Sequence, residues 1–241
     1  MTQEAPTQHD AVLPTPVRRA VWVLGLAISV FGMSFGVLAT TAGLTVPQAV
    51  VMSLLVFTGA SQFAAVSVVE AGGSMGSALG SALLLAARNA AYGVAMAPTL
   101  GKLPLAQRLL GAQLVIDETT AMATAQPEGR LRARTFWATG VSVFVFWNVG
   151  TLLGALAGDA IGDPEALGLD AAFPAGFVVL AVPHLRRREG QVAAAAGALV
   201  ALVLIPLAPA GLPIIAAALG VVPGLLFARR GADRPCRKRQ A

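Results

Sequence analysis

Long apolar stretches alternate with short polar ones along most of the chain. An α-helix needs about 20 residues to cross the hydrocarbon core of a bilayer, and several of these stretches approach that length. The pattern predicts an all-α fold, a polytopic membrane helix bundle of about seven or eight segments. The expected segments are residues 20–40, 47–69, 77–97, 109–125, 136–156, 169–185, 192–208 and 212–228.

One of these segments is interrupted by polar residues. Residues 57–63 read FTGASQF, where lipid would favour leucine. A helix that breaks at mid-depth exposes amide N–H groups and free carbonyls to a polar ligand, so this run predicts a binding site inside the bundle. It also predicts broken or re-entrant helices, which are tolerated at membrane depth only when protein or water surrounds them.

A weak internal repeat accompanies this break. The first three segments of each half begin roughly 115 residues apart, and FPAGF at 173–177 answers FTGASQF in the second half. Paired interruptions of this kind indicate a transporter's binding site. The alternative is that Gly and Pro are simply frequent in membrane helices.

Composition agrees with a membrane environment. Of the 241 residues, 56% are apolar and 12% are charged, and the mean hydropathy is +0.73. A soluble domain has about a quarter charged residues. We expect a transmembrane transporter domain over 19–230, a disordered cytoplasmic tail at 1–18 and a basic cytoplasmic tail at 231–241.

Basic residues collect at the ends of the apolar segments, as they do in cytoplasmic loops of membrane proteins. The formal charge of +5 is therefore a topology signal, and no nucleic-acid partner is expected. With eight crossings and a cytoplasmic N-terminus, every basic cluster falls inside except Lys102 with Arg108. The exception disappears if segments 47–69 and 109–125 each enter and leave on one side. Eight crossings are the default expectation, and both versions place both termini in the cytoplasm.

Three ionisable residues lie inside apolar segments. Arg88 is in the middle of 77–97, and Asp117 and Glu118 are adjacent in 109–125. Such groups cost at least about 2.5 kcal/mol each in a bilayer and persist mainly when paired or when lining a pathway. We expect one carboxylate to neutralise Arg88 and the other to meet substrate or a proton. The alternative is a purely structural ion pair.

The sequence contains no pattern of a cofactor or metal site. Cys236 is the single cysteine, and the two histidines have no neighbouring ligand. An intramembrane metalloprotease would need paired histidines, and a serine hydrolase would need a base beside a GxSxG turn. A passive channel would need a continuous polar stripe, whereas the polar residues here are concentrated in a few segments. We therefore expect no enzyme, no cofactor and no metal, and prefer a carrier to a channel.

Four blocks of the chain resemble the AzlC family, the large subunit of branched-chain amino-acid exporters. They are VFTGASQFAAVSVVEAGG, LLAARNAAYGVAMAPTL, IDETTAMA and LDAAFPAGFVVLAVPHL, in the family's order from residue 56 to residue 185. The resemblance implies a multi-pass efflux permease of the bacterial inner membrane. It implies export of valine, leucine, isoleucine or methionine, use of the proton gradient, a small AzlD-type membrane subunit and contact with lipid. A homo-oligomer is a further expectation.

The chain departs from the family near its buried arginine. Arg88 and Tyr92 match, but Ala86 and Asn89 stand where the family commonly has Asn and His. If that histidine relays protons, its absence puts proton coupling in question here. The change can equally mean a different substrate.

A zwitterionic amino acid needs a cation or helix N-terminus for its carboxylate, an acceptor for its ammonium and an apolar pocket for its side chain. We expect Ser61, Gln62 and the amides near Gly59 to hold the polar groups, and Phe63 and Phe173 to shape the pocket, with hinges at Gly59 and Gly176. The expected substrate-binding residues are Gly59, Ala60, Ser61, Gln62, Phe63, Phe173 and Gly176. The expected ion-pair or proton-coupling residues are Arg88, Tyr92, Asp117 and Glu118.

Overall fold

The computed structural model describes residues 13–161, 178, 181–182 and 185–232. Every regular element in this part of the chain is a helix, which confirms the all-α prediction. Among the described residues, three helical stretches are long and apolar enough to cross a membrane, namely Thr15–Thr41, Arg130–Gly158 and Leu212–Arg229. The last of these is made of two short helices and the 3₁₀ turn between them. The chain therefore has the architecture of a helical membrane bundle.

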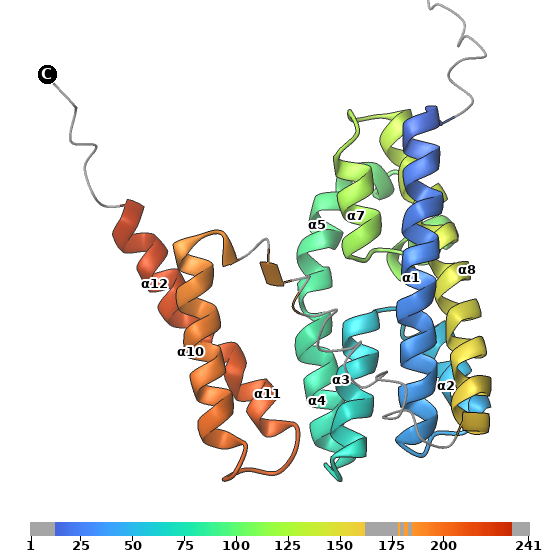
Figure 1. Ribbon diagram of the computed structural model, residues 1–241. Coiled ribbons are helices and arrows are strands. Elements are labelled where there is room, and N and C mark those ends of the chain that lie inside the picture. Colours follow the sequence, from blue (N-terminus) through green and yellow to red (C-terminus); the bar gives the residue numbers. More distant parts are fainter. Residues whose placement is uncertain (1–12, 162–177, 179–180, 183–184, 233–241) are drawn as a thin grey trace, which may run out of the picture.

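Helices α1 (Thr15–Thr41) and α8 (Arg130–Ile161) lie side by side and run in the same direction along the full height of the bundle (Figure 1). Their backbones approach closely because glycines face the partner helix. A Cβ on Gly154 would collide with the backbone of Met33, and one on Gly36 would collide with Thr151. Small residues at four-residue spacing thus let two membrane helices pack backbone to backbone. We name the end where both helices begin, with Arg18 and Arg130, the basic end.

Helices α2 (Val46–Leu55) and α3 (Gly59–Glu70) form a hairpin that starts from the opposite end of the bundle. Thr45 begins α2 as a capping box with Gln48. The helix ends at Leu55, and residues 56–58 are not helical. In Figure 1, α3 then returns to the end from which α2 came. The break predicted at 57–63 is present, and segment 47–69 re-enters instead of crossing.

Helices α4 (Met75–Ala86) and α5 (Arg88–Leu100) follow one another from the opposite end to the basic end (Figure 1). The Ser74 side chain caps the start of α4 by accepting from the amide of Ser77. A turn at Ala87 separates the two helices, directly before Arg88. Together, α4 and α5 extend over the height of the bundle (Figure 1).

Helices α6 (Leu105–Gln113) and α7 (Asp117–Thr124) form a second hairpin, which lies in the half of the bundle next to the basic end (Figure 1). Residues 114–116 interrupt it. Segment 109–125 therefore also re-enters, and the default of eight crossings is wrong for these two segments. Lys102 and Arg108 consequently join the other basic clusters at the basic end.

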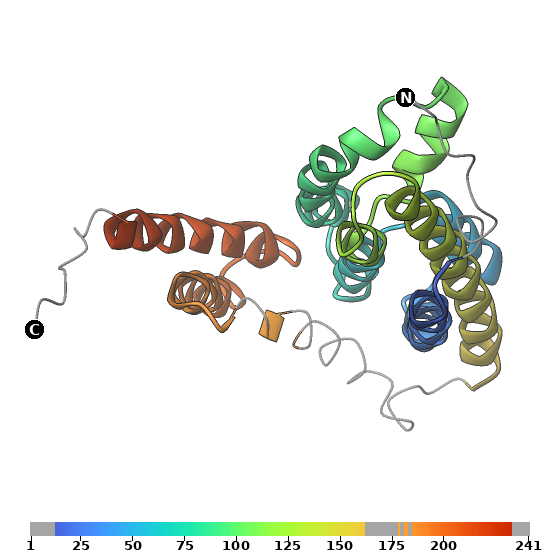
Figure 2. The same cartoon turned by 90° about the horizontal axis from the view of Figure 1, so that it is seen from above.

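Helices α10 (Arg188–Leu204), α11 (Leu212–Ala217) and α12 (Val221–Ala232), with the 3₁₀ turn η3 (Ala218–Gly220), pack together as a separate hairpin. Figure 2 shows this hairpin beside the bundle of α1 to α8. It touches the bundle through α11 and α4, where Ser81 donates a hydrogen bond to the carbonyl of Gly211 at 3.3 Å. Helices α10 and α12 run in opposite directions, since Gly220 packs on Gly197 and Gly224 on Glu189. The basic start of α10 and the basic end of α12 therefore lie at the same end of the hairpin.

The expected repeat stays a prediction. FPAGF at 173–177, with Phe173 and Gly176, lies outside the described residues. Helices α1 and α8, the first elements of the two halves, run in the same direction. The third elements, α4 with α5 and then α10, run in opposite directions (Figure 1).

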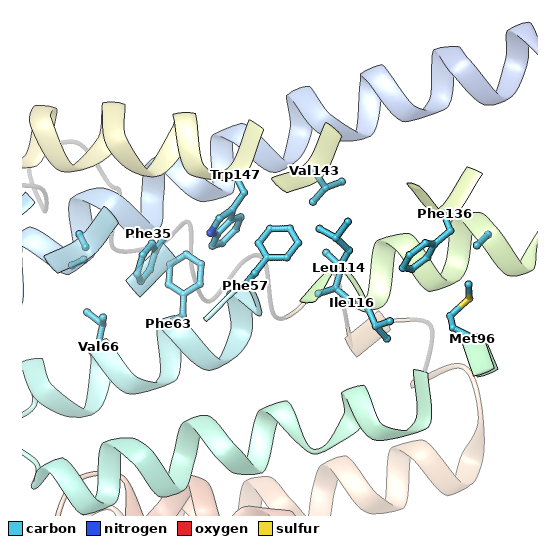
Figure 3. Packing of buried hydrophobic residues seen from close by; sticks show 14 of the residues in the cluster. Phe35, Phe57, Phe63, Val66, Met96, Leu114, Ile116, Phe136, Val143 and Trp147 are labelled. Atoms are coloured by element: carbon cyan, nitrogen blue, oxygen red, sulfur yellow. The ribbon is translucent and has the colours of Figure 1, made fainter. Parts of the chain in front are cut away.

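An apolar core runs along the bundle between α1 and α8 on one side and the two hairpins on the other. Figure 3 shows Phe35, Phe57, Phe63, Leu114, Ile116 and Trp147 within it. Of the non-helical residues of the two hairpins, Phe57 and Leu114 to Ile116 are buried there, whereas Val56 is exposed. The core therefore holds both hairpin tips at the middle of the bundle.

Candidate functional site at the hairpin tips

The two hairpin tips meet at the middle of α8. Leu114 packs on Gly140, and Phe57 packs on Phe144 with ring centroids 4.9 Å apart. These positions on α8 are one turn apart, which places the tips at neighbouring levels. The chain thus brings residues 56–59 and 114–117 to the centre from opposite ends of the bundle.

A direct hydrogen-bonded link joins the two hairpins. The side-chain amide of Gln113, at the end of α6, donates to the carbonyls of Leu54 and Leu55 at 3.2 and 3.1 Å. The last carbonyls of a helix accept no hydrogen bond from within that helix. Helix α2 therefore ends with carbonyls that need a donor from elsewhere. Gln113 supplies that donor from the other hairpin.

The predicted site residues cluster at the starts of three helices. Gly59 is the first residue of α3, Arg88 the first of α5 and Asp117 the first of α7. The remaining described site residues follow within a few positions in the same helices. They are Ala60, Ser61, Gln62 and Phe63 in α3, Tyr92 in α5 and Glu118 in α7. A helix start presents unbonded amides and the positive end of the helix dipole.

The first turn of α3 contains buried polar atoms without a hydrogen-bond partner. The Gln62 side chain is 0% exposed, and neither its nitrogen nor its oxygen is bonded; Ser61 is 1% exposed, and its hydroxyl is unbonded. Thr58 stands at the N-cap position, but its hydroxyl makes no cap hydrogen bond. Each unsatisfied buried group costs about 1–3 kcal/mol. These groups form an unsatisfied polar site beside a helix N-terminus.

Aromatic rings pack against this polar turn. A Cβ on Gly59 would lie 2.9 Å from Cη2 of Trp147, so the glycine lets the indole approach the start of α3. The Trp147 ring stacks on Phe35 at 6.0 Å between centroids and meets Phe63 edge to face at 6.2 Å. The indole N–H of Trp147 is buried without an acceptor. An apolar wall with one further donor therefore adjoins the α3 turn.

The second tip is charged. Arg88 Nη2 and Asp117 Oδ1 form an ion pair at 3.2 Å, with 34% and 24% of the side chains exposed. Glu118 is half-buried and makes no ion pair with any residue that the structure describes. Tyr92 lies one turn beyond Arg88 on α5 and faces the same side of that helix. Their part in coupling stays a prediction.

Thr119 completes the start of α7 from within its own hairpin. Its hydroxyl oxygen accepts from the amide of Ile116 at 3.1 Å, and the hydroxyl contacts the carbonyl of Leu114 at 2.6 Å. The start of α3 has no equivalent internal bonds. Both tips keep buried polar atoms without a partner, since Arg88 Nε, Asn89 Oδ1 and Thr120 Oγ1 are also unbonded. The first tip differs in that its unbonded atoms belong to uncharged side chains at an uncapped helix start.

Three features of this centre were not predicted from the sequence, namely Phe35, Gln113 and the break at Ala87. Phe35 carried no signal, since a phenylalanine in an apolar helix is ordinary. Gln113 has a signal that could have found it, a polar residue directly before the apolar LVI run at 114–116. The break at Ala87 has none, because ALLLAARNAA contains neither Gly nor Pro.

Comparison with known proteins agrees with this membrane architecture. The family described as AzlC protein matches residues 23–161. An uncharacterized membrane protein of Archaeoglobus fulgidus is 35% identical over 77% of this chain and 82% of its own length. An uncharacterized membrane protein of Helicobacter pylori is 28% identical over 76% and 80%. The inner membrane protein YgaZ of Escherichia coli is 28% identical over 68% and 69%.

No solved structure matches the chain. The family match spans more than half of the sequence and contains α2 to α7, which together build both hairpin tips. The chain belongs to the AzlC family of membrane proteins.

Proposed function

We propose that this protein is a carrier that exports branched-chain amino acids or methionine by alternating access. Membership of the AzlC family is consistent with a membrane transporter, and the choice of substrate rests on the family resemblance. The observation that carries the proposal is the unsatisfied polar turn of α3, with Ser61 and Gln62 buried and unbonded at a helix start.

The chemistry of this turn fits the α-carboxylate of an amino acid. Free amides at a helix N-terminus and the side-chain donors of Ser61 and Gln62 are suited to an anion. The rings of Phe63, Trp147 and Phe35 offer an apolar surface for an aliphatic side chain. Asp117 or Glu118 supplies an acidic group for the ammonium or for a coupling proton, and Gly59 is proposed as a hinge.

The proposed orientation in the membrane is based on the positive charges at the basic end. Described lysines and arginines lie there with the exception of Arg88, and under the positive-inside rule this supports a cytoplasmic location for that end. We propose the bacterial inner membrane as the location, with both termini in the cytoplasm. A small AzlD-type subunit is the proposed partner, and a homo-oligomer is a further proposal.

Leucine counterflow in vesicles tests the proposal. The full chain, alone and together with an AzlD-type subunit, is reconstituted and loaded with unlabelled leucine. A carrier takes up labelled leucine in exchange, whereas a channel shows no such acceleration. Valine, isoleucine and methionine should compete, and lysine and glutamate should not.

The site is tested by Gln62→Ala and Ser61→Ala. Both variants should insert normally but lose leucine exchange, since they remove side chains that are unbonded in the protein itself. Gln107→Ala, at an exposed position of α6, is the matched control and should exchange like wild type. Normal exchange by both site variants would refute the site assignment.

A further inference from the structure

The charges at the hairpin tips do not balance. Arg88 is paired with Asp117, which leaves Glu118 as an acidic group without a cation among the described residues. A net charge in the middle of a membrane domain is costly, and it persists mainly where it is functional. The imbalance therefore singles out Glu118 from its neighbour.

Among the described residues, the charged groups that act on Glu118 are Asp117 and Arg88. On α5, the facing ionisable residues are Arg88, already paired, and Tyr92, a neutral phenol. On α7 itself the neighbour is Asp117. Helix α8, which packs on α7, has no charged residue from 135 to 158. A proton is the simplest cation that this place can accept.

The local structure allows both states of the carboxyl group. Glu118 lies in the first turn of α7, where the positive end of the helix dipole favours the carboxylate. The apolar core around the tip, with Ile116 and Val115, favours the neutral acid. A group under two opposed influences can take and release a proton as its access to water changes.

We propose that Glu118 is the proton-carrying residue of the transport cycle, while the Arg88–Asp117 ion pair positions it. This inference rests on the proposed function. A proton from the outer medium binds one carboxylate oxygen of Glu118, and the same O–H bond breaks when the site faces the cytoplasm. Substrate crosses in the other half of the cycle, held by the α3 turn.

The first test needs no substrate. Infrared spectra of the full chain, in vesicles of phosphatidylethanolamine and phosphatidylglycerol, are recorded between about pH 5 and pH 9, where exposed carboxyl groups are already ionised. The C=O band of a protonated carboxylic acid should grow in wild type as the pH falls. It should be missing in Glu118→Gln and present in Glu70→Gln, a control at the exposed end of α3. The same titration in Glu118→Gln as in wild type would overturn the inference.

The second test separates coupling from exchange. An inward proton gradient should stimulate leucine efflux in wild type and in Glu70→Gln. Glu118→Gln should lose that stimulation, while leucine exchange continues at a reduced rate. Stimulation retained in Glu118→Gln, or exchange lost together with it, would overturn the inference. If wild type exchanges no leucine, the proposed function fails, and the infrared titration still decides whether Glu118 carries the proton.

Discussion

The hairpins α2–α3 and α6–α7 have the same plan but different tips. Each enters from one end, breaks over three residues and returns. The first places uncharged polar residues after its break, with Ser61 and Gln62 unbonded. The second places Asp117 and Glu118 there, and Thr119 satisfies its own break.

The proposed function gives the two tips different roles. A tip whose polar groups are left unsatisfied is suited to bind something that is not part of the chain. A tip that carries two acidic groups and one cation is suited to hold a proton or balance a charge. The hydrogen bonds of Gln113 connect the two hairpins.

The largest expected effect on stability comes from breaking the Arg88–Asp117 ion pair at the second tip. Arg88→Gln should lower the free energy of unfolding by about 2–4 kcal/mol, because it leaves Asp117 unpaired in a partly buried place. The double variant Arg88→Gln, Asp117→Asn restores the charge balance and should regain most of that loss. Thermal unfolding in detergent measures both. A double variant no more stable than the single one would show that the pair does not matter.

Cutting the link between the hairpins should cost less. Gln113→Leu removes two hydrogen bonds to α2 and should destabilise the protein by about 1–2 kcal/mol. Gln107→Leu, on the exposed part of the same helix, is the control and should have little effect. Equal unfolding temperatures for the two variants would argue against a link.

The smallest effects concern buried hydroxyl groups on α8 and on the helix that packs against it. Ser53 donates to Thr151 at 3.1 Å beside the first hairpin, whereas Thr135 and Thr139 have no partner beside the second. Ser53→Ala should therefore cost about 1 kcal/mol of stability, and Thr139→Val should leave stability unchanged or raise it, because it removes an unbonded buried hydroxyl. Calorimetry of the two variants measures the difference. A cost for Thr139→Val as large as that for Ser53→Ala would show that this hydroxyl is bonded in the membrane.

Sequence alone predicted the helical membrane fold and the first helix break, and the site residues stay a prediction. Polar residues in FTGASQF indicated the first break, and the misplaced Lys102 and Arg108 indicated re-entry as an alternative to eight crossings. The preferred count of crossings was wrong, because segment length does not show whether a broken helix continues or turns back.

The contacts at the tips could not be predicted in the same way. Adjacent carboxylates gave no reason for Arg88 to choose Asp117 over Glu118; the packing of α5 on α7 decides it. The approach of Trp147 to Gly59 likewise depends on how α8 is rotated against α3. Such contacts join residues far apart in the chain, and no local pattern encodes them.

The re-entrant hairpins are the central claim, and thiol labelling tests them most directly. In a Cys236→Ser background, Thr41→Cys marks the α1–α2 connection, Ala71→Cys the α3–α4 connection and Lys102→Cys the α5–α6 connection. A membrane-impermeant reagent added outside whole cells should label the first two and leave Lys102→Cys unlabelled until the cells are opened. Labelling of Lys102→Cys with protection of Ala71→Cys would contradict the account.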